Sequence, residues 1–147
     1  MGWVGVAARL NAADTWIMSA FSEVELAYLA SQRLGRLATV DRDGNPQNSP
    51  VSFRYNAEFD SIDIGGFGMG TSRKFRNVAG NGRVAFVVDD IASLDPWRVR
   101  CVEIRGTAEA LTGQEPQRPG MSEELIRIRA RRVISFGLAE PAPARPH

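Results

Sequence analysis

The sequence predicts a mainly β protein, a small antiparallel β-barrel of about six strands with two or three short helices. Two observations lead to this fold class. Most of the chain reads as short segments of alternating or continuous apolar residues rich in Val and Ile, separated by clusters of Gly, Asp, Asn and Pro. Helical spacing and capping signals occur in two places. With 147 residues, 44% of them hydrophobic and 24% charged, the chain has the size and composition of one globular domain.

The barrel is expected to occupy residues 18–138 as one domain. Residues 1–17 have weak periodicity and are expected to form a flexible N-terminal extension. The last segment, 139–147, reads "AEPAPARPH" and is expected to be a disordered tail.

The first helix is predicted in "FSEVELAYL", where Ser22 and Glu25 have the spacing of a capping box. The segments "GRLATV" and "QNSPVSFRY" then predict two strands joined by the turn "DRDGNP". Pro50 lies inside the second of these strands. Because proline has no N–H for the ladder, this strand is expected at a sheet edge or at a bulge.

A third strand is predicted in "SIDIGG". "TSRKFRNVAG" then predicts a short helix that Thr71 or Ser72 caps and that Gly80 or Gly82 ends. "RVAFVVDD" is almost continuously apolar, which favours an interior strand. "RCVEIRGTAEAL" and "ELIRIRARRVISFGL" predict two further strands, joined by the Gly- and Pro-rich loop "TGQEPQRPG".

Several function classes are disfavoured by composition. The one histidine, His147, lies at the end of the expected tail, so a Ser-His-Asp or Cys-His site and a Cys/His zinc site are not expected. The one cysteine, Cys101, cannot form an internal disulfide. No apolar run approaches the roughly 20 residues of a membrane span, and the start lacks signal-peptide features. A net charge of +1 argues against a strongly basic nucleic-acid binder, and the cytoplasm is the expected location.

The positive functional signal is the start of the second helix. Lys74 is the single lysine among 18 basic residues, and it follows Arg73 in the expected first turn. A helix N-terminus presents free N–H groups and a positive dipole end, so cations there are unfavourable unless an anion binds. This pattern indicates a phosphate site, with a solvated basic helix face as the open alternative.

The order of these motifs resembles the pyridoxamine 5'-phosphate oxidase-like superfamily of split β-barrel flavoproteins. The resemblance rests on "GRLATVDRDGNPQNSPV", a strand ending in Gly-Gly, "TSRKFRN", an apolar strand and "EIRGTAEA", and it covers about Phe21 to Leu138. Within the superfamily the sequence is most similar to the branch that binds the deazaflavin coenzyme F420. The resemblance implies a homodimer with the cofactor in grooves at the subunit interface.

The resemblance also implies a set of cofactor-binding residues. Ser72, Arg73 and Lys74 would hold the cofactor phosphate, and Asn77 follows where the deazaflavin branch commonly has Asn. The strand along the ring would contribute Gln47, Asn48, Ser49, Pro50 and Val51. The partner subunit would close over the cofactor with Trp97 and Arg98. No metal ligand and no catalytic acid or base is implied.

One position separates the two possible cofactors. Oxidases of this superfamily that use FMN commonly begin the ring-contacting segment with an arginine, and this chain has Ser49 there. The expected function is therefore an F420-dependent oxidoreductase that delivers a hydride to a small organic acceptor of unknown identity. The open alternatives are an FMN-binding reductase or oxidase of the same fold, a non-catalytic F420 or flavin carrier, and a nucleic-acid binder using "RIRARR". In the last case alternation would place Arg127, Arg129 and Arg131 together on one strand face.

Overall fold

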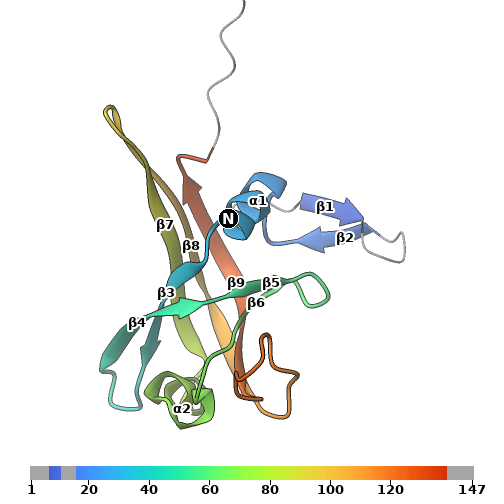
Figure 1. Ribbon diagram of the computed structural model, residues 1–147, viewed down its shortest axis with the longest axis vertical. Coiled ribbons are helices and arrows are strands. Elements are labelled where there is room, and N and C mark those ends of the chain that lie inside the picture. Colours follow the sequence, from blue (N-terminus) through green and yellow to red (C-terminus); the bar gives the residue numbers. More distant parts are fainter. Residues whose placement is uncertain (1–6, 11–15, 139–147) are drawn as a thin grey trace, which may run out of the picture.

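A computed structural model describes residues 7–10 and 16–138. It confirms the expected mainly β fold: one curled, seven-stranded antiparallel sheet, two α-helices and a separate two-stranded hairpin (Figure 1). The elements follow the chain in the order β1 Ala7–Leu10, β2 Trp16–Ser19, α1 Glu23–Ser31, β3 Leu34–Val40, β4 Pro46–Ser52, β5 Arg54–Asn56, β6 Ser61–Ile64, a 3₁₀ turn Met69–Thr71, α2 Arg73–Gly80, β7 Arg83–Leu94, β8 Trp97–Leu111 and β9 Leu125–Phe136.

The strands of the large sheet lie in the order β4-β3-β7-β8-β9-β6-β5, and each neighbouring pair is antiparallel. β4 and β5 lie at opposite edges of the sheet, although only Phe53 separates them in the chain. One nearly continuous segment therefore connects both edges, and the sheet must curl towards a barrel. The position of β4 at an edge confirms the expectation drawn from Pro50, and β7 is an interior strand as its apolar run predicts.

The core fills the concave side of the sheet. Inward-facing residues of β3, β6, β7, β8 and β9 form one cluster, whose fully buried members include Leu37, Ile62, Ile64, Phe86, Val88, Val102, Ile104, Ile126 and Ile128. The backbone at Gly35 makes room for the largest of them. A Cβ atom on Gly35 would lie 2.2 Å from Cζ of Phe86. Only glycine therefore fits at this point of β3 without repacking the core.

The two helices begin where the capping signals place them. In α1 the Ser22 Oγ accepts from the Glu25 N–H at 3.1 Å, and the Glu25 Oε1 accepts from the Ser22 N–H at 2.8 Å, so the capping box is confirmed. In α2 the Ser72 Oγ accepts from the Phe75 N–H at 3.3 Å. That helix ends at Gly80. None of the helices in the described part of the chain is long and apolar enough to cross a membrane.

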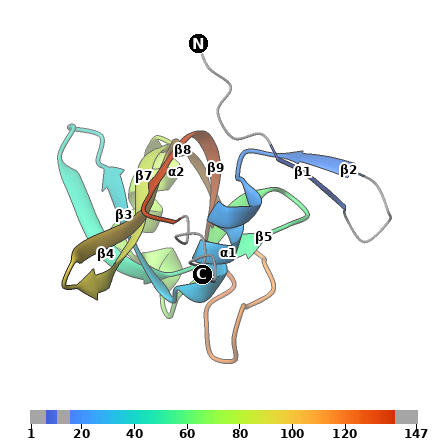
Figure 2. The same ribbon diagram turned by 90° about the horizontal axis from the view of Figure 1, so that it is seen from above.

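The N-terminal hairpin is an element that periodicity did not predict. β1 pairs with β2 in antiparallel register from Ala7–Ser19 to Leu10–Trp16. The hairpin projects away from the barrel (Figure 2). Its end is tied to the body through Asp60, which accepts from the Ser19 hydroxyl at 2.7 Å and the Ala20 N–H at 2.8 Å. The remainder of the expected extension and the expected tail lie outside the described residues.

Two loops meet beside the start of α2. We call residues 65–72 the β6–α2 loop and residues 112–124 the β8–β9 loop. The second corresponds to the predicted Gly- and Pro-rich connection. The Gln114 N–H donates to the Glu123 carbonyl at 2.8 Å, which closes the β8–β9 loop on itself.

Candidate cofactor site

The first turn of α2 concentrates positive charge. Ser72 is its N-cap, and the Ser72 hydroxyl also donates to the Met69 carbonyl at 2.6 Å. Arg73 and Lys74 follow as the first two helical residues, and buried Phe75 fixes the turn against the core. Two cations thus lie beside the free N–H groups of the helix start, where an anion would be stabilised. The structure places the predicted phosphate-binding residues on one surface.

Asn77 connects α2 to the sheet. Its side chain is only 8% exposed, and its Nδ2 donates to the Thr39 Oγ1 at 3.0 Å and approaches the Gln47 Oε1 at 3.5 Å. Two of the predicted residues, Asn77 and Gln47, therefore lie side by side. Thr39, which holds Asn77, was not among the residues singled out in the sequence. The inward alternation of "GRLATV" is the signal that could have identified it.

β4 presents its residues on two faces. Gln47, Ser49 and Val51 face inward, whereas Asn48 and Pro50 are exposed. Val51 belongs to the core and is buried, so its side chain has no free surface for a ligand. The Ser49 hydroxyl is also buried, and it has no hydrogen-bond partner in the described part of the chain. A buried polar atom without a partner is unfavourable, so this position suits a bound polar group.

The open edge of β4 also carries free backbone groups. The Asp41 N–H donates across the β3–β4 turn at 3.0 Å, which makes Asp41 a hydrogen-bonded position of the ladder. Backbone hydrogen bonding alternates along an antiparallel pair. The backbone N–H and C=O groups of Gln47 and Ser49 therefore bond to β3, whereas the backbone groups of Asn48 and Pro50 point away from β3, towards the open edge. The missing N–H of Pro50 consequently costs the sheet nothing. The N–H and C=O of Asn48 and the C=O of Pro50 remain available to a ligand at the edge.

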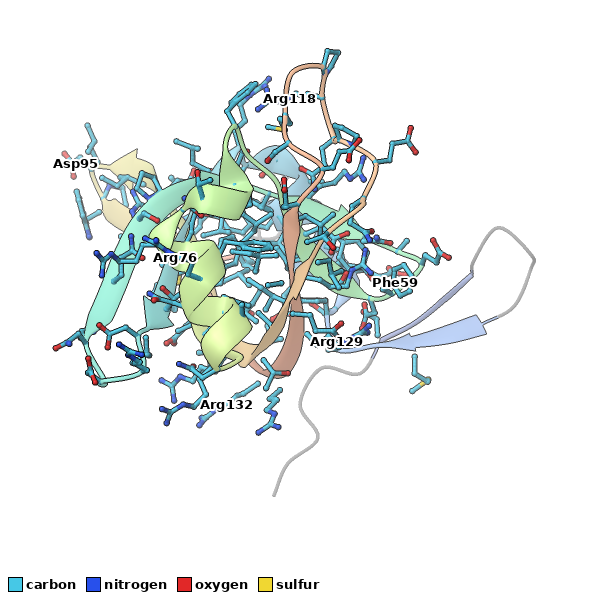
Figure 3. The ribbon with its side chains drawn as sticks, turned by 90° about the horizontal axis from the view of Figure 1, so that it is seen from below. Phe59, Arg76, Asp95, Arg118, Arg129 and Arg132 are labelled. Carbon is cyan, nitrogen blue, oxygen red and sulfur yellow. The ribbon has the colours of Figure 1, made fainter. Side chains whose placement is uncertain are left out.

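A hollow of about 510 Å³ lies between the β3–β4 turn and α2. Its lining residues are Asp41, Arg42, Asp43, Arg73, Arg76 and Asn77. The side formed by α2 is cationic, and Arg76 projects from the helix towards the turn (Figure 3). Hydrogen bonds from the Asn45 backbone and side chain and the Asp43 backbone hold the pKa of Asp41 below its ordinary value, and the charge of Arg73 adds to this effect. The Asp41 carboxylate is therefore engaged in the turn.

Trp97 and Arg98 lie far from this surface. They begin β8 at the tip of the β7–β8 hairpin, and the Trp97 side chain is 63% exposed. β3 pairs with β7 only as far as Val87, and β9 pairs with β8 only from Cys101. Beyond these points β7 and β8 form a two-stranded arm, residues 89–100, whose tip is at the opposite end of the molecule from α2 (Figure 1). One chain does not bring these residues together with Ser72.

The base of this arm is fixed to α1. Arg100 donates twice to the Asp90 carboxylate, at 2.9 and 2.5 Å, and the Tyr28 hydroxyl donates to the same carboxylate at 2.8 Å. The Arg100 guanidinium holds the pKa of Asp90 below its usual range, whereas burial and the neighbouring carboxylate raise the pKa of Tyr28. The direction of the arm is thus set by a charged cluster at its base.

The expectation for the "RIRARR" strand is wrong at Arg127. Its guanidinium is buried, pairs with Asp63 through Nε–Oδ1 at 3.0 Å and Nη2–Oδ2 at 3.1 Å, and stacks on Phe59 with Cζ 4.0 Å from the ring centre. Arg129 and Arg131 are exposed. A register shift near Arg131 breaks the alternation that would have kept the three arginines on one face. Within the described residues, no group of three or more His, Cys, Asp or Glu side chains is placed to hold a metal ion.

Comparison with known proteins identifies the family. Residues 21–141 match the family described as "Pyridoxamine 5'-phosphate oxidase". The 5a,11a-dehydrotetracycline/5a,11a-dehydrooxytetracycline reductase of Streptomyces rimosus is 53% identical over 119 residues, which cover 80% of this chain and 84% of that protein.

Solved structures agree on the fold. The conserved hypothetical protein Rv2991 from Mycobacterium tuberculosis superposes with a TM-score of 0.63 at 24% identity, over 86% of this chain and 93% of that one. The FAD binding protein from Mycobacterium smegmatis gives 0.58 at 19% identity, over 76% of this chain and 89% of that one. At these identities the similarity shows the fold alone. The family match over most of the sequence makes this chain a member of the pyridoxamine 5'-phosphate oxidase-like split-barrel family and an oxidoreductase.

Proposed function

We propose that the protein is an F420-dependent reductase whose acceptor is a small polycyclic compound of the dehydrotetracycline kind. The observation that carries this proposal is the 53% identity, over 80% of the chain, to a protein named a dehydrotetracycline reductase. Reduced F420, when bound, would supply the hydride for a carbon–carbon double bond of the acceptor. The chain's own residues bind the cofactor, orient it and exclude water.

The phosphate is assigned to the start of α2. Ser72, Arg73 and Lys74 combine a helix N-terminus with two cations, one of them the only lysine of the chain. Lysine presents a compact ammonium, which suits a single phosphate crowded by backbone donors better than the wide fork of arginine. The use of lysine in a chain that otherwise relies on arginine supports this role.

The ring is assigned to β4. The open edge at Asn48 and Pro50 offers a donor and acceptors to the polar edge of a flavin or deazaflavin ring. The buried Ser49 hydroxyl lacks a partner among the described residues, and the amides of Gln47 and Asn77 lie nearby. Val51 is assigned a backbone contact only, because its side chain is in the core.

The choice of F420 over FMN rests on what surrounds the phosphate. FMN ends at its phosphate, whereas F420 continues into a lactyl and oligoglutamate tail with several carboxylates. The hollow beside α2 has Arg73 and Arg76 for carboxylates, and Asp43 on the facing turn for an amide N–H group. In addition, Ser49 occupies the position at which FMN oxidases of this superfamily commonly have an arginine. These features favour the longer, more anionic cofactor.

We further propose that the active form is a homodimer, in which Trp97 and Arg98 of one copy close the site of the other. The arm exposes large apolar side chains at Ile91, Leu94 and Trp97, and Phe136 is exposed where β9 joins its base. An isolated two-stranded hairpin is marginally stable in water, and such a patch is typical of an interface. Light scattering should give twice the 16.1 kDa chain mass, and the monomer mass at micromolar concentration would contradict the proposal.

Ligand titration tests the cofactor assignment. Purified protein should be colourless and should bind F420 with micromolar affinity, followed by quenching of deazaflavin fluorescence. Binding should weaken with added salt, because tail carboxylates are screened. Reduced F420 should be reoxidised when a dehydrotetracycline is added. A yellow protein that keeps stoichiometric FMN through dialysis and ignores F420 would instead establish the FMN reductase alternative, and binding without turnover of any acceptor would establish a carrier.

A further inference from the structure

The two loops beside α2 form a single rigid platform. The Ser122 N–H and hydroxyl both donate to the Gly66 carbonyl, at 3.0 and 2.9 Å, and the Ser122 hydroxyl accepts from the Met69 N–H at 3.0 Å. The Gln117 amide donates to the Asp63 carbonyl at 3.2 Å. The β8–β9 loop is therefore bonded to the end of β6 and to the β6–α2 loop, and the position of one loop fixes the position of the other.

Phe67 stands on this platform with most of its ring in solvent. Its side chain is 71% exposed, more than that of Trp97 at 63% or Phe136 at 54%. One edge of the ring rests on the β8–β9 loop, where a Cβ atom on Gly120 would lie 3.3 Å from Cε1. Gly68, the next residue, has a φ of 64°, which other residues rarely adopt. The backbone thus holds an aromatic side chain outward, although its burial would stabilise the fold.

The platform leads directly into the proposed phosphate site. The chain passes from Phe67 through the 3₁₀ turn Met69–Thr71 to Ser72, with Thr71 N–H bonded to Gly68 and Ser72 N–H bonded to Met69. Only four residues separate Phe67 from the N-cap Ser72, and three of them form the 3₁₀ turn. An acceptor stacked on Phe67 would therefore lie near the start of α2, where the cofactor phosphate is assigned.

A cation lies on the same platform. Arg118 forms a tight turn with Met121, whose N–H donates to the Arg118 carbonyl at 3.2 Å, and this turn contains Gly120. The Arg118 side chain is exposed and lies beside the β6–α2 loop (Figure 3). The Phe67 surface therefore has a cation beside it, while the β8–β9 loop also carries Glu115, Glu123 and Glu124. A planar polycycle bearing an acidic enol oxygen has the matching chemistry.

We propose that Phe67 is a specificity-determining residue, which stacks on the planar ring system of the acceptor while Arg118 attracts its acidic oxygen. This inference rests on the proposed function, because it deepens the assignment of the substrate. It implies that contact with Phe67 adds little to the binding affinity of a small monocyclic enone. A flat polycycle, in contrast, covers the ring and removes its apolar surface from water.

Three variants and two acceptors test the proposal. Phe67→Ala removes the ring, Phe67→Tyr restores it, and Val24→Ala is a control at another exposed apolar residue on α1. The acceptors are a dehydrotetracycline and cyclohex-2-en-1-one, with saturating reduced F420. Phe67→Ala should raise the KM for the dehydrotetracycline about tenfold with little change in kcat, as expected for loss of one aromatic contact and its buried area. Phe67→Tyr and Val24→Ala should match the parent, and KM for cyclohexenone should stay within about twofold.

Equilibrium binding separates this inference from the proposed function. Tetracycline fluorescence gives the Kd of the polycycle for each variant without cofactor, and F420 quenching gives the Kd of the cofactor. Loss of polycycle affinity in Phe67→Ala with unchanged F420 affinity is the expected result. Equal tetracycline Kd for parent and Phe67→Ala, or no binding by the parent, would overturn the role of Phe67 whatever the cofactor result. Failure of the parent to bind F420 would overturn the proposed function independently.

Discussion

The buried ion pair between Arg127 and Asp63 offers the sharpest test of the structure itself. The two side chains are only 10% and 2% exposed, and the Asp63 carboxylate also accepts from Asn56 at 2.8 Å and Ser61 at 2.9 Å. Arg127→Met keeps an unbranched apolar side chain but removes the guanidinium, with its charge and both hydrogen bonds. The carboxylate then stays buried without its cation. Breaking a buried pair in this way should lower the free energy of unfolding by about 3–5 kcal/mol.

The loss should depend on pH in a defined direction. Burial raises the pKa of Asp63, but hydrogen bonds from Arg127, Asn56 and Ser61 outweigh it and leave the pKa below the ordinary 3.8. A lowered pKa means that the unfolded chain takes up the proton first as pH falls. The stability from this carboxylate is therefore fully present above about pH 4 and is lost as pH falls through the folded pKa. A protonated Asp63 needs no cation, so the cost of Arg127→Met should shrink towards about pH 3.

Urea denaturation at fixed protein concentration, at about pH 7 and about pH 3, measures both effects. Arg129→Met is the matched control on the same strand, because Arg129 and its partner Glu109 are 47% and 55% exposed. This control should cost about 1 kcal/mol or less. The reasoning would be refuted if Arg127→Met cost no more than the control, or if its cost were the same at both pH values.

Three further predictions follow from other contacts. Gly35→Ala should destabilise the fold by about 1–3 kcal/mol through overpacking against Phe86, whereas Gly80→Ala, where an added Cβ meets no atom within 4 Å, should be neutral or stabilising; thermal melts compare the two. Lys74→Ala should weaken F420 binding by about 1.5–3 kcal/mol and leave the melting temperature of the cofactor-free protein unchanged or slightly higher, whereas an earlier melt with intact binding would favour a solvated helix face. Deletion of residues 1–17 should preserve folding and cofactor binding by circular dichroism and titration, because Ser19 and Ala20, which donate hydrogen bonds to Asp60, both remain.

Local signals predicted the parts of the fold that local chemistry determines. The caps at Ser22 and Ser72 involve residues three apart, and Pro50 restricts its strand through its own missing N–H. Each of these features is visible in a window of a few residues. The capping signals and the edge position of β4 were for that reason predicted correctly.

Long-range partners were not visible in this way. Arg127 alternates like a solvated residue, and what buries it is Asp63, 64 positions earlier in the chain, together with the ring of Phe59. The platform under Phe67 likewise depends on Ser122, which is 56 positions from its partner Gly66. Such contacts arise from the order of strands in the sheet. Periodicity carries no information about that order.

The separation of α2 from the arm leads to a last prediction about the active form. β7 begins just after α2 and runs 12 residues to the tip of the arm, about 35 Å at the usual rise of a strand. A cofactor held at Lys74 therefore cannot touch Trp97 of the same chain. If Lys74 and Trp97 serve the same site, that site must contain Lys74 from one copy of the chain and Trp97 from another. Lys74→Ala and Trp97→Ala should then each reduce activity strongly.

Mixing the two variants by co-expression should restore part of the activity. Half of the randomly formed dimers would contain one copy of each variant, and one of the two sites in such a dimer would have both residues intact. The expected recovery is about a quarter of the parent activity, because a two-fold dimer exchanges the same elements in both directions. Each variant expressed alone gives the baseline activity. Activity no higher than that baseline would show that Trp97 does not complete the site of a partner, and would leave the assignment of α2 to the phosphate standing on its own contacts.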